Sequence, residues 1–83
     1  MPVDSQAALE IARFIASHPS PEQVIAFQAS PEVVARAYAL VEAERSRALT
    51  DDEHQEMDSL LTIQHIMILA KAEAHRQIQQ QAS

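Results

Sequence analysis

The chain has 83 residues and a mass of 9.2 kDa, which corresponds to one small domain. It contains no cysteine and no glycine, which excludes disulfides, thiolate metal sites and the glycine-rich loops that hold phosphates or dinucleotides. Twelve acidic and six basic side chains give a formal charge of −6, which disfavours binding to a nucleic-acid backbone. We therefore expect an acidic protein without a cofactor, and composition alone does not reveal its function.

The N-terminal residues show no basic segment followed by an apolar run, so we expect no signal peptide. The most apolar window, 63–74, is interrupted by Gln64, Lys71 and Glu73. It is also shorter than the roughly 20 residues that a membrane span needs. The lack of cysteine fits a reducing compartment. We expect a cytoplasmic protein that does not contact a membrane.

Three capping residues mark helix starts along the chain. Ser20 is followed by a proline, and Gln23 stands at the third helical position, which is the pattern of a capping box. Ser30 repeats the Ser-Pro start ten residues later. Thr50 is followed by three acids, the last of which is Glu53, so it combines a capping box with carboxylates beside the positive helix end. These signals divide the chain into helices.

No segment alternates between apolar and polar residues over a useful length, so strands are not expected. The sequence predicts an all-α fold, a small helical bundle in one domain over 1–83. Three shorter helices pack against one long C-terminal helix. The predicted helices cover about 4–17, 21–28, 31–47 and 51–79, with a frayed tail over 80–83.

The first and third helices each show one apolar stripe at a helical spacing of 100° per residue. In the first helix the stripe consists of Ala8, Ile11, Ala12 and Ile15. In the third it consists of Val33, Val34, Ala37, Tyr38, Leu40 and Val41. We expect both stripes, Tyr38 included, to lie in the core.

The last helix carries two apolar stripes. The first consists of Leu60, Ile63, Met67, Ala70, Ala74 and Ile78, and the second of Met57, Leu61, Ile68 and Ala72. Two stripes require two neighbours, and the short helices supply only one. A helix over 51–79 is also about 43 Å long, whereas a domain of this size is about 30 Å across. We therefore expect a dimer.

The interface is predicted on this helix, at Ile63, Ile66, Met67 and Leu69, with Lys71 and His75 at its edge. Gln64 joins Lys71 and His75 along the seam between the stripes. Such polar residues either fix the register of a helical interface or border a groove with their stems on apolar surface. If it is buried there, His75 would make association depend on pH near neutrality.

Catalytic and metal chemistry find little support in the sequence. His54 and Asp58 are spaced i, i+4, but no third ligand completes a metal site. The first acids after Thr50 are explained by the helix dipole, while Glu56 and Asp58 form an acidic patch that suits a basic partner. The basic residues are scattered, so binding to nucleic acid is not expected. We expect a protein that is not an enzyme.

The order of the motifs resembles a family of small, functionally uncharacterised bacterial proteins that are common in cyanobacteria. The family pattern is roughly PEEIIAFRxSPE, and residues 21–32 here are PEQVIAFQASPE. The later parts correspond to LTDDE at 49–53, EMD at 56–58 and LAKAEA at 69–74. The resemblance covers about Ser20 to Arg76. It departs before Leu49, where the family often has Glu-Gly and this chain has Arg47 and Ala48.

Genes of this family resemble short reading frames found beside HNH-type or PIN-type nuclease genes. The resemblance therefore implies a helical, antitoxin-like companion of a nuclease, and it carries over no catalytic residue. The acidic charge independently suits a basic partner, because it would steer the two proteins together. Our leading expectation is a non-enzymatic protein–protein interaction module of this kind. The alternatives are a homodimeric structural or regulatory protein without a nuclease partner and, third, a DNA-binding regulator.

Overall fold

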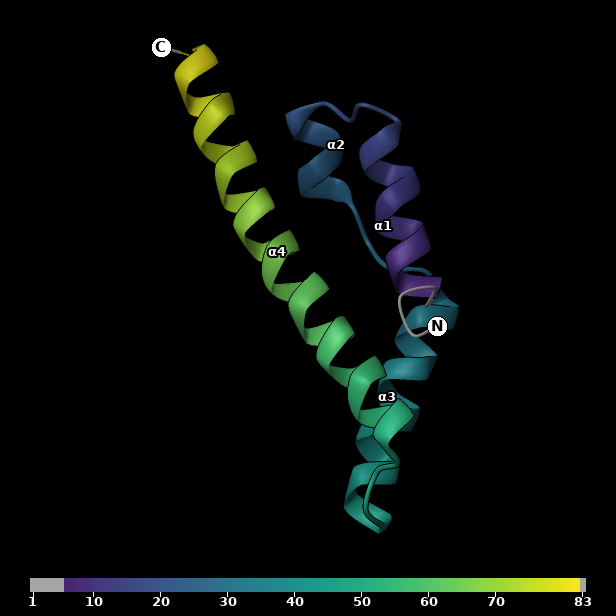
Figure 1. Cartoon of the computed structure of the whole chain (residues 1–83). Helices are drawn as coiled ribbons and strands as arrows, with labels where there is room; N and C mark the ends of the chain where they lie inside the picture. Colours follow the sequence, from purple (N-terminus) through teal and green to yellow (C-terminus); the bar gives the residue numbers. More distant parts are fainter. Residues whose placement is uncertain (1–5, 83) are drawn as a thin grey trace.

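The computed structural model describes residues 6–82, which form four helices and no strand (Figure 1). The all-α architecture with one long C-terminal helix is therefore confirmed. The helices are α1 (Gln6–Ala16), α2 (Pro21–Ala26), α3 (Pro31–Ser46) and α4 (Asp51–Ala82).

The three predicted caps are all present. The Ser20 hydroxyl accepts from the Gln23 N–H at 3.2 Å, and the Gln23 side chain accepts from the Ser20 N–H at 2.8 Å. The Ser30 hydroxyl accepts from the backbone of the third residue of α3. At the start of α4, Thr50 and Glu53 exchange the same pair of bonds, at 3.1 and 2.9 Å. These local bonds satisfy amides that have no partner within their helices.

The helix ends differ by a few residues from the predicted ones. The N–H of His18, two residues after α1, donates to the Ile15 carbonyl, and His18 adopts a left-handed backbone with φ of 56°. Pro19 follows it and disfavours the right-handed helical region. At the other end of the chain, α4 continues to Ala82, beyond the predicted end at 79. The predicted residues 4, 5 and 83 lie outside the described part.

The long helix α4 organises the molecule, since each of the other three helices packs against it. Figure 1 shows α3 beside the first turns of α4, while α2 lies beside the C-terminal half of α4 and α1 lies on the far side of α2. The molecule measures 52 × 23 × 19 Å. Its radius of gyration is 15.1 Å, whereas a compact domain of this length has about 12 Å. The fold is elongated and open.

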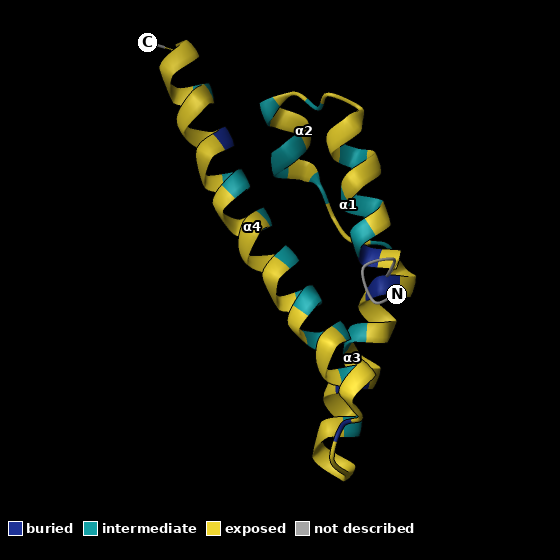
Figure 2. Ribbon diagram, in the orientation of Figure 1, coloured by how far each residue is buried: buried dark blue, intermediate teal, exposed yellow. Residues whose placement is uncertain are grey.

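The core is correspondingly thin. Of the described residues, only the side chain of Leu40 is almost fully buried, at 1% exposure. The other buried residues are Ala7, Val33, Leu49 and Ala74. The first apolar stripe of α4 is half-buried or buried and follows the edge that faces the other helices (Figure 2). The second stripe lacks a neighbour at Leu61 and Ile68, which are both exposed.

The predicted burial of the two apolar stripes in α1 and α3 is wrong in part. In α3, Val33 and Leu40 are buried, but Val34, Tyr38 and Val41 are exposed. The stripe extends about 160° around the helix, and its single close neighbour, α4, covers only one edge of it. In α1, Ala12 and Ile15 are exposed.

The orientation of α1 is set by contacts made elsewhere on the helix. The Phe14 ring packs on Phe27 with centroids 4.5 Å apart. The carboxylate of Glu10 accepts from the hydroxyl of Ser30 at 2.5 Å. These two contacts turn the Phe14 side of α1 inward, which leaves Ile15 in solvent.

Candidate interaction surfaces

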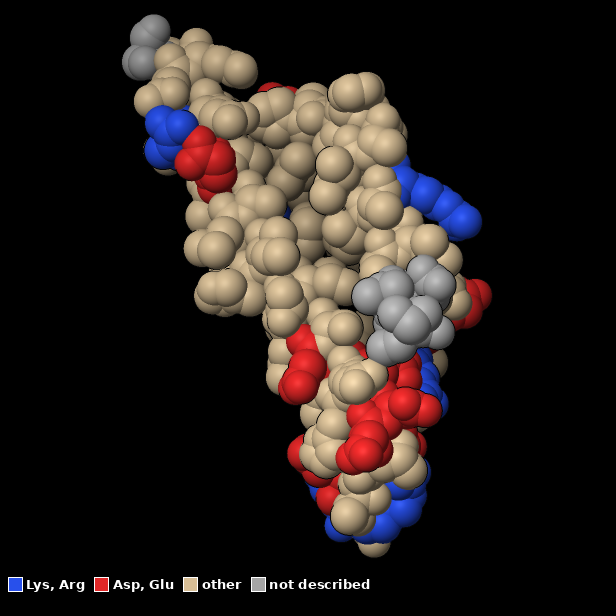
Figure 3. All heavy atoms as spheres, viewed as in Figure 1, with Lys and Arg blue, Asp and Glu red and all other residues tan. Residues whose placement is uncertain are grey.

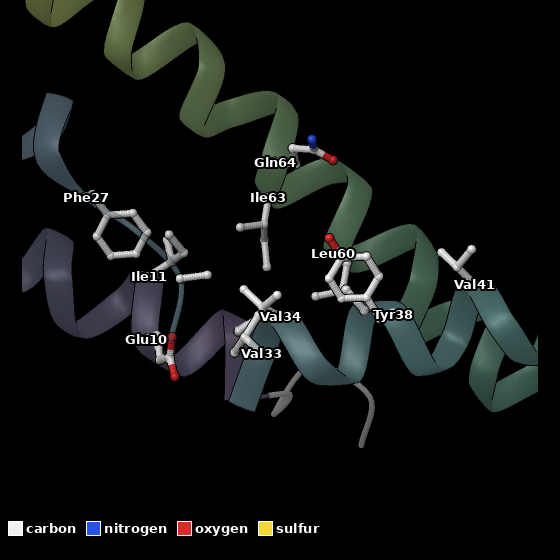
Figure 4. Close-up of a pocket in the computed structure, with 13 residues that line it drawn as sticks. Glu10, Ile11, Phe27, Val33, Val34, Tyr38, Val41, Leu60, Ile63 and Gln64 are labelled. Carbon is white, nitrogen blue, oxygen red and sulfur yellow. The ribbon is translucent and has the colours of Figure 1, made fainter. Parts of the chain in front are cut away.

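An apolar groove lies between α1, α3 and α4. It has a volume of about 420 Å³, and Figure 4 shows side chains from all three helices directed into it. Its apolar lining includes Ile11, Phe27, Val34, Tyr38, Leu60 and Ile63. We call it the α1–α3–α4 groove. Its size is that of an ordinary small-molecule pocket or of the space that a few inserted side chains fill.

Polar groups are few in the groove. Glu10 and Gln64 are the charged and amide-bearing residues of its lining. The Glu10 carboxylate accepts from the Ser30 hydroxyl, from the Ser30 N–H at 3.2 Å and from the Gln6 amide at 3.0 Å. The hydrogen bond from the Ser30 hydroxyl, with that from Gln6, lowers the pKa of Glu10. Glu10 is therefore an ionised structural group that fastens α1 to the start of α3.

The rim of the groove is formed by α3. Val34, Tyr38 and Val41 are spaced by four and three residues, so they form one row on the helix surface. Tyr38 is 72% exposed, the largest value among the exposed large apolar residues of the described chain. These three residues were expected in the core. The width of the stripe in the sequence was the signal that one neighbour is not enough to cover it.

The predicted interface residues fall on different sides of α4. Ile63 and Met67 are half-buried on the inward edge, and Ile63 lines the groove. Ile66 and Leu69 are 52% and 57% exposed. With Leu61 and Ile68 they form a second apolar surface, which we call the outer α4 face. The four apolar residues predicted for the interface therefore do not form one surface.

The polar residues at the predicted edge also separate. The Lys71 ammonium donates to the Phe27 carbonyl at 2.8 Å, which ties α4 to the end of α2. His75 is exposed in the single chain, and Gln64 is exposed while it borders the groove. Lys71 thus has a role within the chain, whereas Gln64 matches the prediction of a residue that borders a groove.

Charged side chains gather at the α3–α4 end, and the face around the hollow carries few of them (Figure 3). Arg36 forms a two-pronged pair with Glu56, both N–O distances being 2.7 Å. Arg47 pairs in the same way with Glu53 at 2.8 Å. Glu56 is therefore engaged within the chain, so the predicted acidic patch retains Asp58 as its exposed acid.

Glu53 accepts hydrogen bonds from two directions. The Arg47 guanidinium, together with the backbone N–H of Thr50, lowers the pKa of Glu53 from 4.5 to about 2. The guanidinium of Arg36 likewise lowers the pKa of Glu56. Both carboxylates hold α3, or the loop after it, against the first turns of α4. Their chemistry is that of structural ion pairs.

Across residues 6–82, no three histidine, aspartate or glutamate side chains lie close enough together to hold a metal ion. None of the described helices combines the length and the apolar character needed to cross a bilayer. Comparison of the chain with family models, with curated proteins and with solved structures finds no match. The resemblance to the nuclease-associated family stays a prediction.

Proposed function

We propose that this chain is a non-enzymatic protein–protein interaction module. The observation that carries the proposal is the amount of apolar surface that the fold leaves uncovered. Nine large apolar side chains of the described residues are more than 40% exposed. They gather mainly on the α3 rim of the groove and on the outer α4 face. Exposed apolar side chains that are grouped in this way mark sites of protein association.

A non-enzymatic role is supported by the chemistry of the groove. The carboxylate of Glu10, the acidic residue of the groove lining, already accepts three hydrogen bonds from Ser30 and Gln6. A general acid or base must reach a substrate proton at hydrogen-bond distance. The groove instead offers mostly apolar side chains, which favour burial of another apolar surface.

The partner implied by the resemblance is a nuclease, for which this chain would be an antitoxin-like companion. The formal charge of −6 supports a basic partner, because opposite charges accelerate encounter. Since Glu53 and Glu56 are paired with arginines, the steering charge comes from exposed acids such as Asp52 and Asp58. The outer α4 face supplies the apolar contact.

Co-purification of the tagged chain from its native host, followed by mass spectrometry, tests the proposal. We expect a stoichiometric partner that is lost with Ile66→Glu, because a carboxylate desolvated in an apolar interface costs about 2 kcal/mol or more. That cost weakens binding about 30-fold. Ile66 is half exposed, so the helicity of the variant should be unchanged.

Gln55→Glu is the matched control for Ile66→Glu. It adds the same charge on the same side of α4, about 16 Å earlier along the helix, and Gln55 is exposed outside the apolar surface. The control should retain the partner. A nuclease among the recovered proteins would support the companion role. Recovery of the chain alone, with or without the substitution, would contradict a role that requires a different protein.

A further inference from the structure

The chain exposes more surface area than an average folded monomer of its mass. The chain exposes 6095 Å², whereas a folded monomer of 9.2 kDa exposes about 4,900 Å². The excess is roughly 1,200 Å². Each partner in a standard interface loses about 800 Å², and each subunit of an obligate homodimer about 1,000–2,500 Å². This excess is of the same order as the area that one subunit of a stable homodimer buries.

The chemistry of the α1–α3–α4 groove restricts its occupant. The lining is apolar apart from Glu10, Gln64 and the Tyr38 hydroxyl, and the carboxylate of Glu10 is engaged by Ser30 and Gln6. A basic peptide would find no available carboxylate among these residues. An occupant with apolar side chains and without charge is favoured, because burying an unpaired charge costs far more than an apolar contact gains.

The chain itself presents a surface of that chemistry. Val34, Tyr38 and Val41 form an exposed, uncharged row along the α3 side of the groove, where they are part of its lining (Figure 4). A two-fold axis brings the same patch of both subunits together, so it would place the exposed row of each subunit against the groove of the other. Tyrosine is also a frequent anchor at the centre of interfaces.

We propose that a second copy of this chain occupies the groove. In the resulting two-fold dimer, the Tyr38 row of each α3 enters the α1–α3–α4 groove of the other subunit. The dimer goes beyond the proposed function, in which a different protein makes its apolar contact with the outer α4 face. It also supplies the apolar burial that a thin core around Leu40 lacks in the single chain.

Tyr38 provides a direct readout, because the chain has one tyrosine and no tryptophan. Its fluorescence therefore reports on this single site. We would measure acrylamide quenching and sedimentation of the purified full chain from about 1 µM to about 1 mM, which covers weak and strong dimers. The expected mass is twice 9.2 kDa. Quenching of Tyr38 should fall about threefold or more in the dimer, since anchor residues are nearly desolvated.

Substitutions identify the surface. Tyr38→Glu should weaken dimerisation about 30-fold or more, with unchanged helicity because the side chain is exposed in the single chain. Ala39→Glu adds the same charge to an exposed position 100° further round α3. This control should still dimerise, as should Ile66→Glu on the outer α4 face.

Three results would overturn the proposal. One is a single-chain mass at every concentration. Another is a dimer in which Tyr38 stays as open to acrylamide as in the single chain, since that dimer would use another surface. The third is protection of Tyr38 only after a different protein is added. None of these results depends on whether the outer α4 face binds a nuclease, so failure of this proposal and failure of the proposed function are separate outcomes.

Discussion

Lys71 connects two parts of the chain that lie far apart in the sequence. Its ammonium group donates to the carbonyl of Phe27, 44 residues earlier, at a partly buried position. The carbonyl belongs to the residue that ends α2, where backbone acceptors lack partners within the helix. One lysine thus satisfies a helix end and fixes the position of α2 along α4. Ser30 and Glu10 fasten α1 in a comparable way.

Replacing Lys71 by Met retains the apolar stem and removes the donor. We expect Lys71→Met to lower the free energy of unfolding by about 1–2 kcal/mol, the usual cost of losing a charged hydrogen bond to a partly buried acceptor. Urea denaturation followed by circular dichroism would measure it. Lys71→Arg, which keeps a donor, should lose less. Equal stability of Lys71→Met and the wild type would show that the bond adds nothing.

The start of α4 joins helix capping to an ion pair. Glu53 closes the capping box with Thr50 and also binds Arg47. The pKa of Glu53 is therefore held at about 2 instead of 4.5. In the unfolded chain this carboxyl takes up a proton at a higher pH than in the folded chain. Its contribution to stability is present above pH 4.5 and is lost as the pH falls toward about 2.

Glu53→Gln isolates this contribution, since glutamine retains the capping box but not the charge. We expect the wild type to be more stable than the variant above pH 4.5, with the two converging as the pH approaches 2. Unfolding free energies measured by urea titration at several pH values would follow the difference. A difference that stays constant across this range would contradict a role for the Glu53 charge.

Helix α4 is longer than any of the three helices that pack against it. The molecule extends 52 Å in one direction and has one almost fully buried side chain, Leu40, among the described residues. Small domains with so little core gain much of their stability by association. The stability of this chain should accordingly depend on its concentration.

If the dimer forms, its Tm should rise by about 4 °C for each tenfold increase in chain concentration, because unfolding is coupled to dissociation. Differential scanning calorimetry at two or three concentrations would measure the shift. Tyr38→Glu should lower the Tm at each concentration, because its dimer dissociates more readily. A wild-type Tm that does not change with concentration would contradict stabilisation by association.

The interaction surfaces were only partly predictable. The exposed positions of Ile66 and Leu69 follow from their place outside both stripes of α4, and the structure places them there. Ile63 was predicted at an intermolecular interface; it is half-buried within the chain and lines a groove that also depends on α1 and α3. Tyr38 was not predictable as a surface residue, since its spacing fits a core position equally well.

The sequence by itself determined the number of helices, the starts of α2, α3 and α4, and the great length of the last one. Ser20, Ser30 and Thr50 act on amides within three residues, so these features need no distant partner. The tertiary structure decided which side of each helix is buried. An apolar stripe specifies only that a helix has a neighbour, whereas contacts between distant residues, such as Phe14 with Phe27, select the edge that the neighbour covers. The groove beside Tyr38 exists because α4 covers one edge of α3 and leaves the other open.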